Sequence, residues 1–351
     1  MKIFMDILPD NGSRIQGGRA FFSYIYGLGV RLRLIAYRRI KRKSLPGFVI
    51  SVGNLTVGGT GKTPTACMLA EWALGEGYRV AILSRGYGGN YRKKVLAVSD
   101  GEKITVGPNQ SGDEPYLLAR KLKGVPVVIS KKRYLAGLFA NKKFDTNFFI
   151  LDDGFQHLAL ERNMDLVLID ASSPFGNGHL LPWGTLREPI AQLKRADAFI
   201  ITRSGHESRE NELLGLLTKR YPTKPIFRGD HIPERIVFPG QNRVYEPEFL
   251  SGKRVMAFAG IAQPEAFKET LISLGADLIF FKSFRDHHSF TDNEIQELVA
   301  RKERMNVDYL FTTEKHCVRL EHLVPKNPDL AFLAIRVALI PQHDAFFSMI
   351  K

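Results

Sequence analysis

The fold of this chain is decided by one stretch, Val49-Ile50-Ser51-Val52-Gly53-Asn54-Leu55-Thr56-Val57-Gly58-Gly59-Thr60-Gly61-Lys62-Thr63-Pro64. A strand-like run leads into a glycine-rich loop and then into a helix-compatible stretch, which is the order that phosphate-binding loops require. Gly58, Gly59 and Gly61 permit backbone angles that turn successive N–H groups toward a phosphate, and the helix start adds the positive end of its dipole. The stretch therefore predicts a phosphate-binding loop in an α/β protein.

Two side chains of this loop would serve a bound nucleoside triphosphate. Lys62 is expected to reach the β- and γ-phosphates, and the Thr63 hydroxyl is expected to hold Mg²⁺. The common pattern G-x-x-x-x-G-K-S/T has glycine where this chain has Thr56, so the loop is a variant. The candidate nucleotide-binding residues are Asn54, Gly58, Gly59, Thr60, Gly61, Lys62 and Thr63.

Short apolar runs alternate with helix-like stretches on both sides of the loop. The runs cover residues 48–52, 80–83, 125–129, 147–151, 166–169 and 198–201, and residues 63–74 and 114–122 are long enough for crossover helices. The runs are near-continuous, as in strands that are buried on both faces. They predict an α/β fold of the P-loop NTPase type, a parallel sheet with helices on both faces.

A second series of strands follows a region dotted with prolines. Its predicted strands are 255–259, 278–281, 309–312 and 331–335, with helices that begin at Pro264 and Thr291. A chain of 351 residues also exceeds the size at which one core usually stops growing. We expect a basic, aromatic N-terminal segment (1–45), a P-loop domain (46–222), a linker (223–250) and a smaller C-terminal α/β domain (251–351).

A pair of carboxylates follows the predicted strand 147–151. Asp152 and Asp153 come directly after four apolar residues, the form of a Walker B strand that brings acids to the metal side of a nucleotide site. Either aspartate alone could be a turn residue beside Gly154, and the sequence leaves open which one contacts the metal. A GTPase has Asn-Lys-x-Asp, which recognises guanine, after a later strand. After the strand 198–201 this chain has Thr202-Arg203-Ser204-Gly205 at that place, so ATP is the expected nucleotide.

Positive charge is concentrated near the N-terminus. The formal net charge is +14, and no acidic residue lies between Asp10 and Glu71. That interval holds ten basic residues: Arg14, Arg19, Arg31, Arg33, Arg38, Arg39, Lys41, Arg42, Lys43 and Lys62. Between Arg14 and Lys43 the longest charge-free run is 20–30. It is rich in aromatic residues but would reach only roughly 16 Å as a helix, against a bilayer core of ~30 Å. We therefore expect an interfacial helix on an anionic membrane surface.

Other interpretations of this segment stay open. It could be an ordinary first helix packed on the domain. Nucleic-acid binding would suit the charge, but no recognition helix, zinc finger or RNP-type motif accompanies it, so we expect no such partner. Cys67 and Cys317 form no C-x-x-C pair, which favours a reducing cytoplasm, and residues 1–13 show no secretion signal.

Five motifs, taken together, resemble those of one family. They are the variant loop, Ser84-Arg85-Gly86-Tyr87-Gly88, Gly112-Asp113-Glu114-Pro115, Asp152-Asp153-Gly154-Phe155-Gln156-His157 and Gly184-Thr185-Leu186-Arg187-Glu188-Pro189. The chain closely resembles the tetraacyldisaccharide 4′-kinase family of lipid A biosynthesis, whose loop pattern also accounts for Thr56. The resemblance is strong up to about Pro189 and weaker beyond it.

The resemblance implies an activity and a location. ATP would donate its γ-phosphate to the 4′-hydroxyl of a lipid A disaccharide 1-phosphate precursor, which gives lipid IVA. The enzyme would be a peripheral protein on the cytoplasmic face of the inner membrane of a Gram-negative bacterium. The resemblance implies no obligate protein partner.

The resemblance also implies roles for individual residues. Asp113 matches the family's catalytic base, and His287 matches a histidine that assists it; a sugar hydroxyl is a poor nucleophile and needs such a carboxylate. Glu188 matches a residue that reaches Mg²⁺, beside the candidates Thr63, Asp152 and Asp153. The candidates for contact with the phosphorylated disaccharide are Arg133, His157, Glu114 and Arg187.

Structural roles and other functions remain as alternatives. Asp113 could be a helix N-cap, and His287 could be a surface histidine near a helix start. His316 occupies a position where family members commonly have aspartate, and we assign it no catalytic role. A nucleotide-driven switch at the membrane would not need Asp113 as a base, and a kinase of a small soluble substrate would not need the basic segment.

Overall fold

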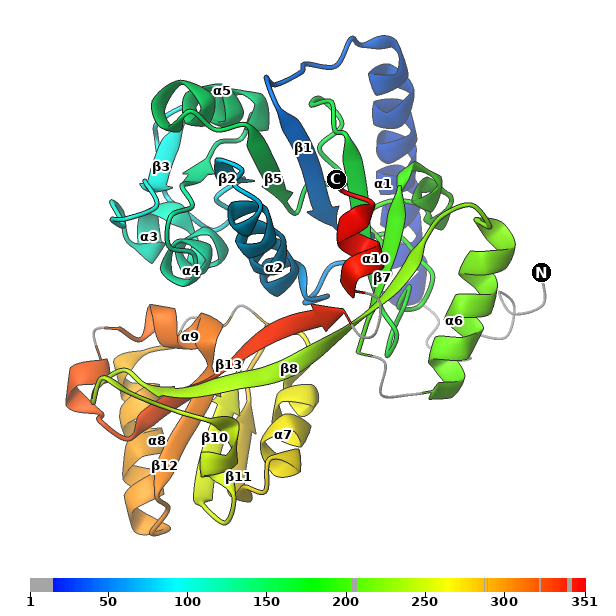
Figure 1. The fold of residues 1–351 in the computed structure, drawn as a ribbon. Coiled ribbons are helices and arrows are strands. Elements are labelled where there is room, and N and C mark those ends of the chain that lie inside the picture. Colours follow the sequence, from blue (N-terminus) through cyan, green and yellow to red (C-terminus); the bar gives the residue numbers. More distant parts are fainter. Residues whose placement is uncertain (1–14, 204–206, 287, 289, 322, 340–342) are drawn as a thin grey trace. The chain divides into compact units, whose positions relative to one another are not determined.

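The computed structural model describes residues 15–203, 207–286, 288, 290–321, 323–339 and 343–351 (Figure 1). His287 lies outside the described residues, as does the beginning of the expected segment 1–45. The chain divides into two compact units, and each unit is built from more than one stretch of sequence. The first unit comprises residues 1–85, 128–230 and 338–351, and the second comprises residues 86–127 and 231–337.

The first unit is built on a parallel sheet. Its strands are β1 (Phe48–Gly53), β2 (Val80–Ser84), β4 (Val127–Ile129), β5 (Phe148–Asp152), β6 (Met164–Asp170), β7 (Ala198–Thr202) and the first part of β8 (Ile226–Phe238). Its helices are α1 (Ile15–Arg39), α2 (Lys62–Gly75), α5 (Arg133–Phe144), η1 (Ile190–Arg195), α6 (Glu207–Arg220) and α10 (His343–Ser348). The strand order is β8-β7-β6-β1-β5-β2-β4, and every pairing from β8 to β2 is parallel.

The position of β1 inside this sheet explains where the phosphate loop lies. β1 pairs with β6 on one side and with β5 on the other, and Val52 lies opposite Asp152. Because neighbouring parallel strands end at the same edge, the loop after β1 and the acids after β5 emerge together. All of β5, and β1 after its first residue, is buried, which is why both strands read as near-continuous apolar runs.

The last helix, α10, completes the core of the first unit. Phe346 and Phe347 are buried, the ring of Phe347 stacks on Trp72 of α2 at 4.7 Å, and the ring of Phe346 meets Phe227 of β8 edge-on at 5.0 Å. Lys351 also pairs with Glu76 just after α2. Residues far along the chain therefore pack against the helix that follows the phosphate loop.

The second unit contains a smaller group of strands, most of which are parallel. Its strands are β3 (Leu96–Ser99), the rest of β8, β9 (Arg243–Tyr245), β10 (Arg254–Ala259), β11 (Asp277–Ser283), β12 (Tyr309–Thr313) and β13 (Leu330–Leu339). Its helices are α3 (Pro108–Ser111), α4 (Asp113–Lys121), η2 (Pro247–Leu250), α7 (Pro264–Ser273), α8 (Asp292–Arg304), α9 (Glu314–Arg319) and η3 (Val324–Lys326). The strand order β11-β10-β12-β13 is parallel throughout, whereas β9 pairs antiparallel with β8.

Helices cover both faces of the sheet where β10 to β13 lie. Val255 of β10 belongs to the same hydrophobic cluster as Phe267 of α7, whereas the next residue, Met256, belongs to a different cluster with Ile295 of α8. Successive strand residues point to opposite faces, so α7 lies on one face and α8 on the other. The expected α/β fold class, with parallel strands between helices, is confirmed.

The division into units differs from the boundaries expected from the sequence. Residues 226–238, expected in a linker, form the 13-residue strand β8. Pro233 lies between the residues that pair with β7 and those that pair with β9, where a missing N–H does not interrupt either of these pairings. Residues 86–127, expected in the P-loop domain, fall in the second unit, and residues 338–351 return to the first.

Candidate active site

The phosphate loop has the backbone of an anion-binding nest. Gly58 and Gly61 have φ values of 121° and 85°, in the left-handed region that side chains disfavour. Helix α2 begins at Lys62 with Gly61 as its N-cap, and within the described residues no side chain caps this end. The first N–H groups of α2 are thus available to an anion, and the helix dipole favours one.

Lys62 is nearly buried and is held by several oxygens. Its Nζ donates to Asn54 Oδ1 at 3.2 Å and to the Gly58 carbonyl at 3.5 Å, and it lies 3.7 Å from Asp153 Oδ1. Asn54 is itself fully buried, and its Nδ2 donates to Thr56 Oγ1 at 3.4 Å. Thr56, the departure from the common loop pattern, thereby belongs to the group of side chains that fixes Lys62.

The two aspartates after β5 have different surroundings. Asp152 is buried and accepts a hydrogen bond from Ser84 Oγ at 3.2 Å. Asp153 has a positive φ of 50° and accepts from Arg187 Nη1 at 2.7 and 2.8 Å. Burial alone would raise the pKa of Asp153, but the charges of Lys62 and Arg187 outweigh it and lower the pKa, so this carboxylate is ionised.

Glu188 is completely buried between two guanidinium groups. One carboxylate oxygen accepts from Arg33 of α1 at 2.7 Å, and the other accepts from Arg195 of η1, also at 2.7 Å. Arg195 additionally lies over the ring of Phe155 and donates to its carbonyl. A role for Glu188 at a metal would require the exchange of at least one of these bonds.

The oxygen groups near the loop fit a magnesium ion. Thr63 supplies a hydroxyl, and Asp152 and Asp153 supply carboxylates, which are the hard oxygen ligands that Mg²⁺ prefers. In the described part of the chain, no three His, Cys, Asp or Glu side chains form a metal-binding cluster. In a nucleotide site, phosphate oxygens and water supply most of the ligands of Mg²⁺.

Arg133 and His157 lie in a strongly positive part of the first unit. Arg133 is the first residue of α5, is buried, and its charge acts on both His157 and Asp153. Burial lowers the pKa of His157 to about 4, with a further contribution from nearby guanidinium groups, those of Arg133, Arg162, Arg85 and Arg33. His157 is therefore neutral at pH 7, in surroundings that favour an anion.

Asp113 is the first residue of α4 in the second unit. The N-cap of α4 is Gly112, so the structure does not support the alternative in which Asp113 is the cap. A Cβ at Gly112 would lie 2.2 Å from the carbonyl oxygen of Tyr87, which explains glycine at the start of this motif. The Asp113 carboxylate forms an ion pair with Arg319 at the end of α9. Glu114 beside it pairs with Lys315 at 3.2 Å.

His316 has a structural position in the second unit. It is buried, its Nε2 lies 3.1 Å from the Gly260 carbonyl, and its Nδ1 lies 2.9 Å from Thr313 Oγ1. Donation from Nε2 to the carbonyl leaves Nδ1 to accept from the hydroxyl. Burial lowers the pKa of His316 to about 4, so it is neutral and joins the end of β10 to the start of α9.

Several residues that contact the candidates were not predicted from the sequence. Arg33 and Arg195 bind Glu188, Arg319 binds Asp113, and Lys315 binds Glu114. The sequence contained one signal for the partners of Asp113 and Glu114. Lys315 and Arg319 are four residues apart, so they lie on the same face of α9. Neither arginine at Glu188 has a comparable signal.

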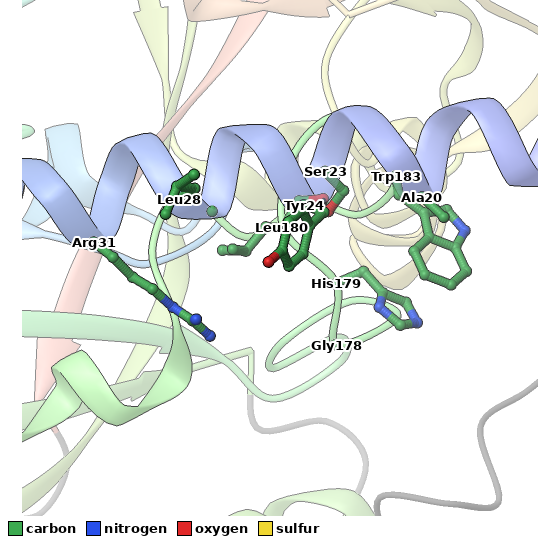
Figure 2. A pocket seen from close by; sticks show the side chains of 10 residues that line it. Ala20, Ser23, Tyr24, Leu28, Arg31, Gly178, His179, Leu180 and Trp183 are labelled. Carbon is green, nitrogen blue, oxygen red and sulfur yellow. Dashed lines mark hydrogen bonds between the residues drawn. The ribbon is translucent and has the colours of Figure 1, made fainter.

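A pocket of about 320 Å³ lies between α1 and the loop 178–183 (Figure 2). Tyr24, Leu28 and Arg31 of α1 border it on one side, and the stacked rings of His179 and Trp183 border it on the other. Ser23 Oγ donates to the Leu180 carbonyl at 2.8 Å, which holds the helix to this loop. No helix in the described ranges is long and apolar enough to cross a membrane.

Most large apolar side chains of α1 are exposed. They are Phe21, Phe22, Tyr24, Ile25, Leu28, Leu32 and Ile35, each between 48% and 71% exposed. Val30 and Ser23, by contrast, are buried against the unit. An ordinary helix packed on a domain would turn its apolar residues inward, so this arrangement favours a surface that meets something apolar.

The parallel sheet, the nest at α2 and the acids after β5 define the class of this protein as a P-loop phosphotransferase. The family model described as tetraacyldisaccharide-1-P 4′-kinase (LpxK) matches residues 20–351. The chain belongs to this family of kinases, as its motifs predicted, and it is an enzyme.

Relatives of known name support the assignment over most of the chain. The tetraacyldisaccharide 4′-kinase of Pelobacter propionicus is 42% identical over 94% of this chain and 91% of its own length. That of Syntrophus aciditrophicus is 40% identical over 92% and 88%. The solved structure of LpxK from Aquifex aeolicus in complex with ATP has a TM-score of 0.76 and 32% identity, and the match covers 96% of this chain and 98% of that chain.

Proposed function

We propose that this enzyme transfers the γ-phosphate of ATP to the 4′-hydroxyl of a tetraacyldisaccharide 1-phosphate and so forms lipid IVA. The family and the named relatives support the reaction. The observation that carries the nucleotide part is the buried cluster in which Lys62 is held beside Asp153 at the phosphate nest.

Each group in this cluster has a task in the transfer. The N–H groups at the start of α2 and the Lys62 ammonium bind the β- and γ-phosphates. Thr63, Asp152 and Asp153 would hold Mg²⁺, which supplies positive charge to the β- and γ-phosphate oxygens. Arg187 keeps Asp153 oriented and ionised through its two short contacts.

The acceptor hydroxyl needs a base. The Asp113 carboxylate takes the proton of the 4′-hydroxyl as the new P–O bond forms, and ADP leaves with the electron pair of the broken bond. His287 and Glu114 remain candidates to assist on the acceptor side.

The phosphate already present on the acceptor fits the positive region around His157. Arg133 suits it because a guanidinium can bond two phosphate oxygens at once. The neutral imidazole of His157 can both donate and accept hydrogen bonds, as recognition of a sugar phosphate requires.

We further propose that α1 holds the enzyme on an anionic membrane surface as a peripheral protein, on the cytoplasmic face of the inner membrane. Its exposed apolar side chains would enter the headgroup boundary, and the basic residues at its end would meet anionic lipid. The pocket beside Tyr24 and Trp183 would accommodate apolar chains of the lipid substrate.

Two other functions remain distinguishable from this one. A nucleotide switch would hydrolyse ATP without any lipid acceptor, and a kinase of a soluble sugar would phosphorylate an acceptor that lacks acyl chains. The exposed apolar face of α1 supports the lipid substrate over the soluble one.

The test is an incubation of the purified protein with γ-labelled ATP, Mg²⁺ and tetraacyldisaccharide 1-phosphate in detergent micelles. We expect label in the lipid, at least ~10²-fold less in Asp113→Asn, and none in a de-acylated disaccharide phosphate. Label in inorganic phosphate alone would support the switch and would refute the proposal.

A further inference from the structure

The carboxylate proposed as the base is held by one arginine from a distant part of the sequence. Arg319 Nη2 pairs with Asp113 Oδ2, and only 12% of the Asp113 side chain is exposed. Asp113 and Arg319 both belong to the second unit, at the first residue of α4 and the last residue of α9. The pair is therefore internal to one compact body.

The same guanidinium has a second partner. Arg319 Nη1 donates to the backbone carbonyl of His288 at 3.0 Å. His288 is fixed in turn, because its Nε2 lies 3.0 and 3.1 Å from the two oxygens of Glu294, and its ring stacks on Phe284. Arg319 thus connects Asp113 to the turn that follows β11.

We infer that Arg319 is a positioning residue for Asp113, which it aims at the acceptor hydroxyl by tying the carboxylate to the backbone at His288. The inference rests on the proposed role of Asp113 as base. The planar guanidinium offers two N–H donors in a fixed geometry, so it sets the direction of the carboxylate and not only its charge. A base that is misplaced by about 1 Å can cost about 10²-fold in rate.

Other ion pairs between α4 and its neighbours lack this connection. Arg120 of α4 pairs with Glu321 beyond α9, and Tyr116 donates to the same carboxylate at 3.0 Å. These contacts hold α4 in place, but they do not involve Asp113. Arg120 therefore provides a matched control for loss of an ion pair at the same helix.

The experiment measures kcat and KM for ATP and for the lipid acceptor in the full-length enzyme, in micelles. Arg319→Met should lower kcat by about 10- to 100-fold and leave both KM values within about twofold. Arg319→Lys keeps the charge but loses the two-pronged geometry, so it should recover only part of the rate. Arg120→Gln should keep the wild-type kcat.

A double mutant separates positioning from a general effect on packing. If Arg319 acts only through Asp113, adding Arg319→Met to Asp113→Asn should lower kcat no further. Multiplicative losses, or equal losses in Arg319→Met and Arg120→Gln, would overturn the inference. Thermal unfolding of each variant identifies a folding defect. If Arg319→Met has such a defect, Arg319→Lys is the deciding variant, and a wild-type kcat in Arg319→Lys would also overturn the inference.

The outcomes distinguish this inference from the proposed function. If Asp113→Asn is nearly inactive while Arg319→Met has normal kcat, Asp113 remains the base and Arg319 has no positioning role. If Asp113→Asn itself turns over at the wild-type rate, the proposed base is wrong, and the role of Arg319 is refuted with it.

Discussion

At the scale of single residues, Asn54 links the unusual sequence of the phosphate loop to the placement of its lysine. Its side-chain carbonyl accepts from Lys62 and its amide donates to Thr56, so all three side chains belong to one buried network. A buried ammonium without such acceptors is costly, because its N–H groups have lost water. The loop therefore achieves the position of Lys62 with a polar side chain where the common pattern has glycine.

Replacement of Asn54 tests this network. Asn54→Leu keeps the branched shape and the number of heavy side-chain atoms but removes the acceptor for Lys62, and hydrogen bonds to charged groups contribute roughly 1.5–3 kcal/mol. We expect the Kd for ATP, measured by calorimetry, to rise about 10-fold or more. Val57→Ala changes a 40% exposed side chain of the same loop and serves as control. An unchanged Kd in Asn54→Leu would show that Lys62 does not depend on this contact.

At the scale of elements, helix α1 is connected to the nucleotide site through residues 180–188. Tyr26 Oη donates to the Arg187 carbonyl at 3.0 Å, and Arg33 binds Glu188. The same segment lies against the phosphate loop, since the Arg187 amide donates to the Leu55 carbonyl at 2.7 Å. The helix proposed to meet the membrane therefore contacts the backbone that flanks the phosphate loop.

The two arginines at Glu188 should contribute unequally to stability. The Arg195 side chain is 15% exposed, whereas that of Arg33 is 43% exposed. Loss of one partner of a buried ion pair costs about 3–5 kcal/mol, whereas exposed pairs contribute about 0–1 kcal/mol. We expect Arg195→Met to lower the free energy of unfolding by roughly 3 kcal/mol and Arg33→Met by about 1 kcal/mol or less. Urea denaturation measures both, and equal losses would contradict this ranking.

The basic residues at the end of α1 and just after it should determine binding to anionic membranes. Reversal to glutamate at Arg38, Arg39, Arg42 and Lys43 removes attractions of about 1 kcal/mol each and adds repulsion. We expect the partition coefficient onto phosphatidylserine vesicles to fall by at least about 10³-fold at low salt. A matched reversal at Arg92, Lys93, Lys103 and Lys123, all exposed, should leave it within a few-fold. Comparable losses in both variants would indicate non-specific charge attraction.

At the scale of the whole molecule, acid should destabilise both units through one histidine each, which is partly buried in the first unit and buried in the second. His157 and His316 have pKa values near 4, below the ordinary value of 6.5, because burial disfavours the charged imidazolium. Between pH 6.5 and 4 the unfolded chain binds more protons than the folded one, so stability falls as the pH falls. Each histidine contributes a loss of up to roughly 3 kcal/mol across that window.

Glutamine variants test this pH dependence. His157→Gln and His316→Gln should each flatten the loss of unfolding free energy between pH 7 and 5, measured by chemical denaturation at several pH values. The unfolding free energy of each variant at lower pH is compared with its own value at pH 7. This comparison removes the effect of a missing hydrogen bond, which is the same at all pH values. A slope identical to that of the wild type would mean that the folded protein does not hold the histidine concerned in its neutral form.

The strands and the phosphate loop were predictable because they depend on neighbours in sequence. A buried strand followed by Gly58, Lys62 and Thr63 is enough to predict the phosphate loop. Asp152 was predictable beside the loop because neighbouring parallel strands end at the same edge of the sheet. No periodic pattern in the sequence indicates the pairing of Glu188 with Arg33, which lies 155 residues away. The strand β8 was missed for a related reason, since its mixed burial produces no apolar run.

The contribution of α10 to the first unit has a consequence for biosynthesis. Phe346 and Phe347 complete the packing around Trp72 of α2, yet the ribosome makes them more than 250 residues after that helix. The nucleotide-binding unit thus cannot finish folding before Phe346 and Phe347 have left the ribosome, because until then part of its core is missing. Nascent chains arrested before residue 338 should accordingly be degraded by proteases that the finished protein resists.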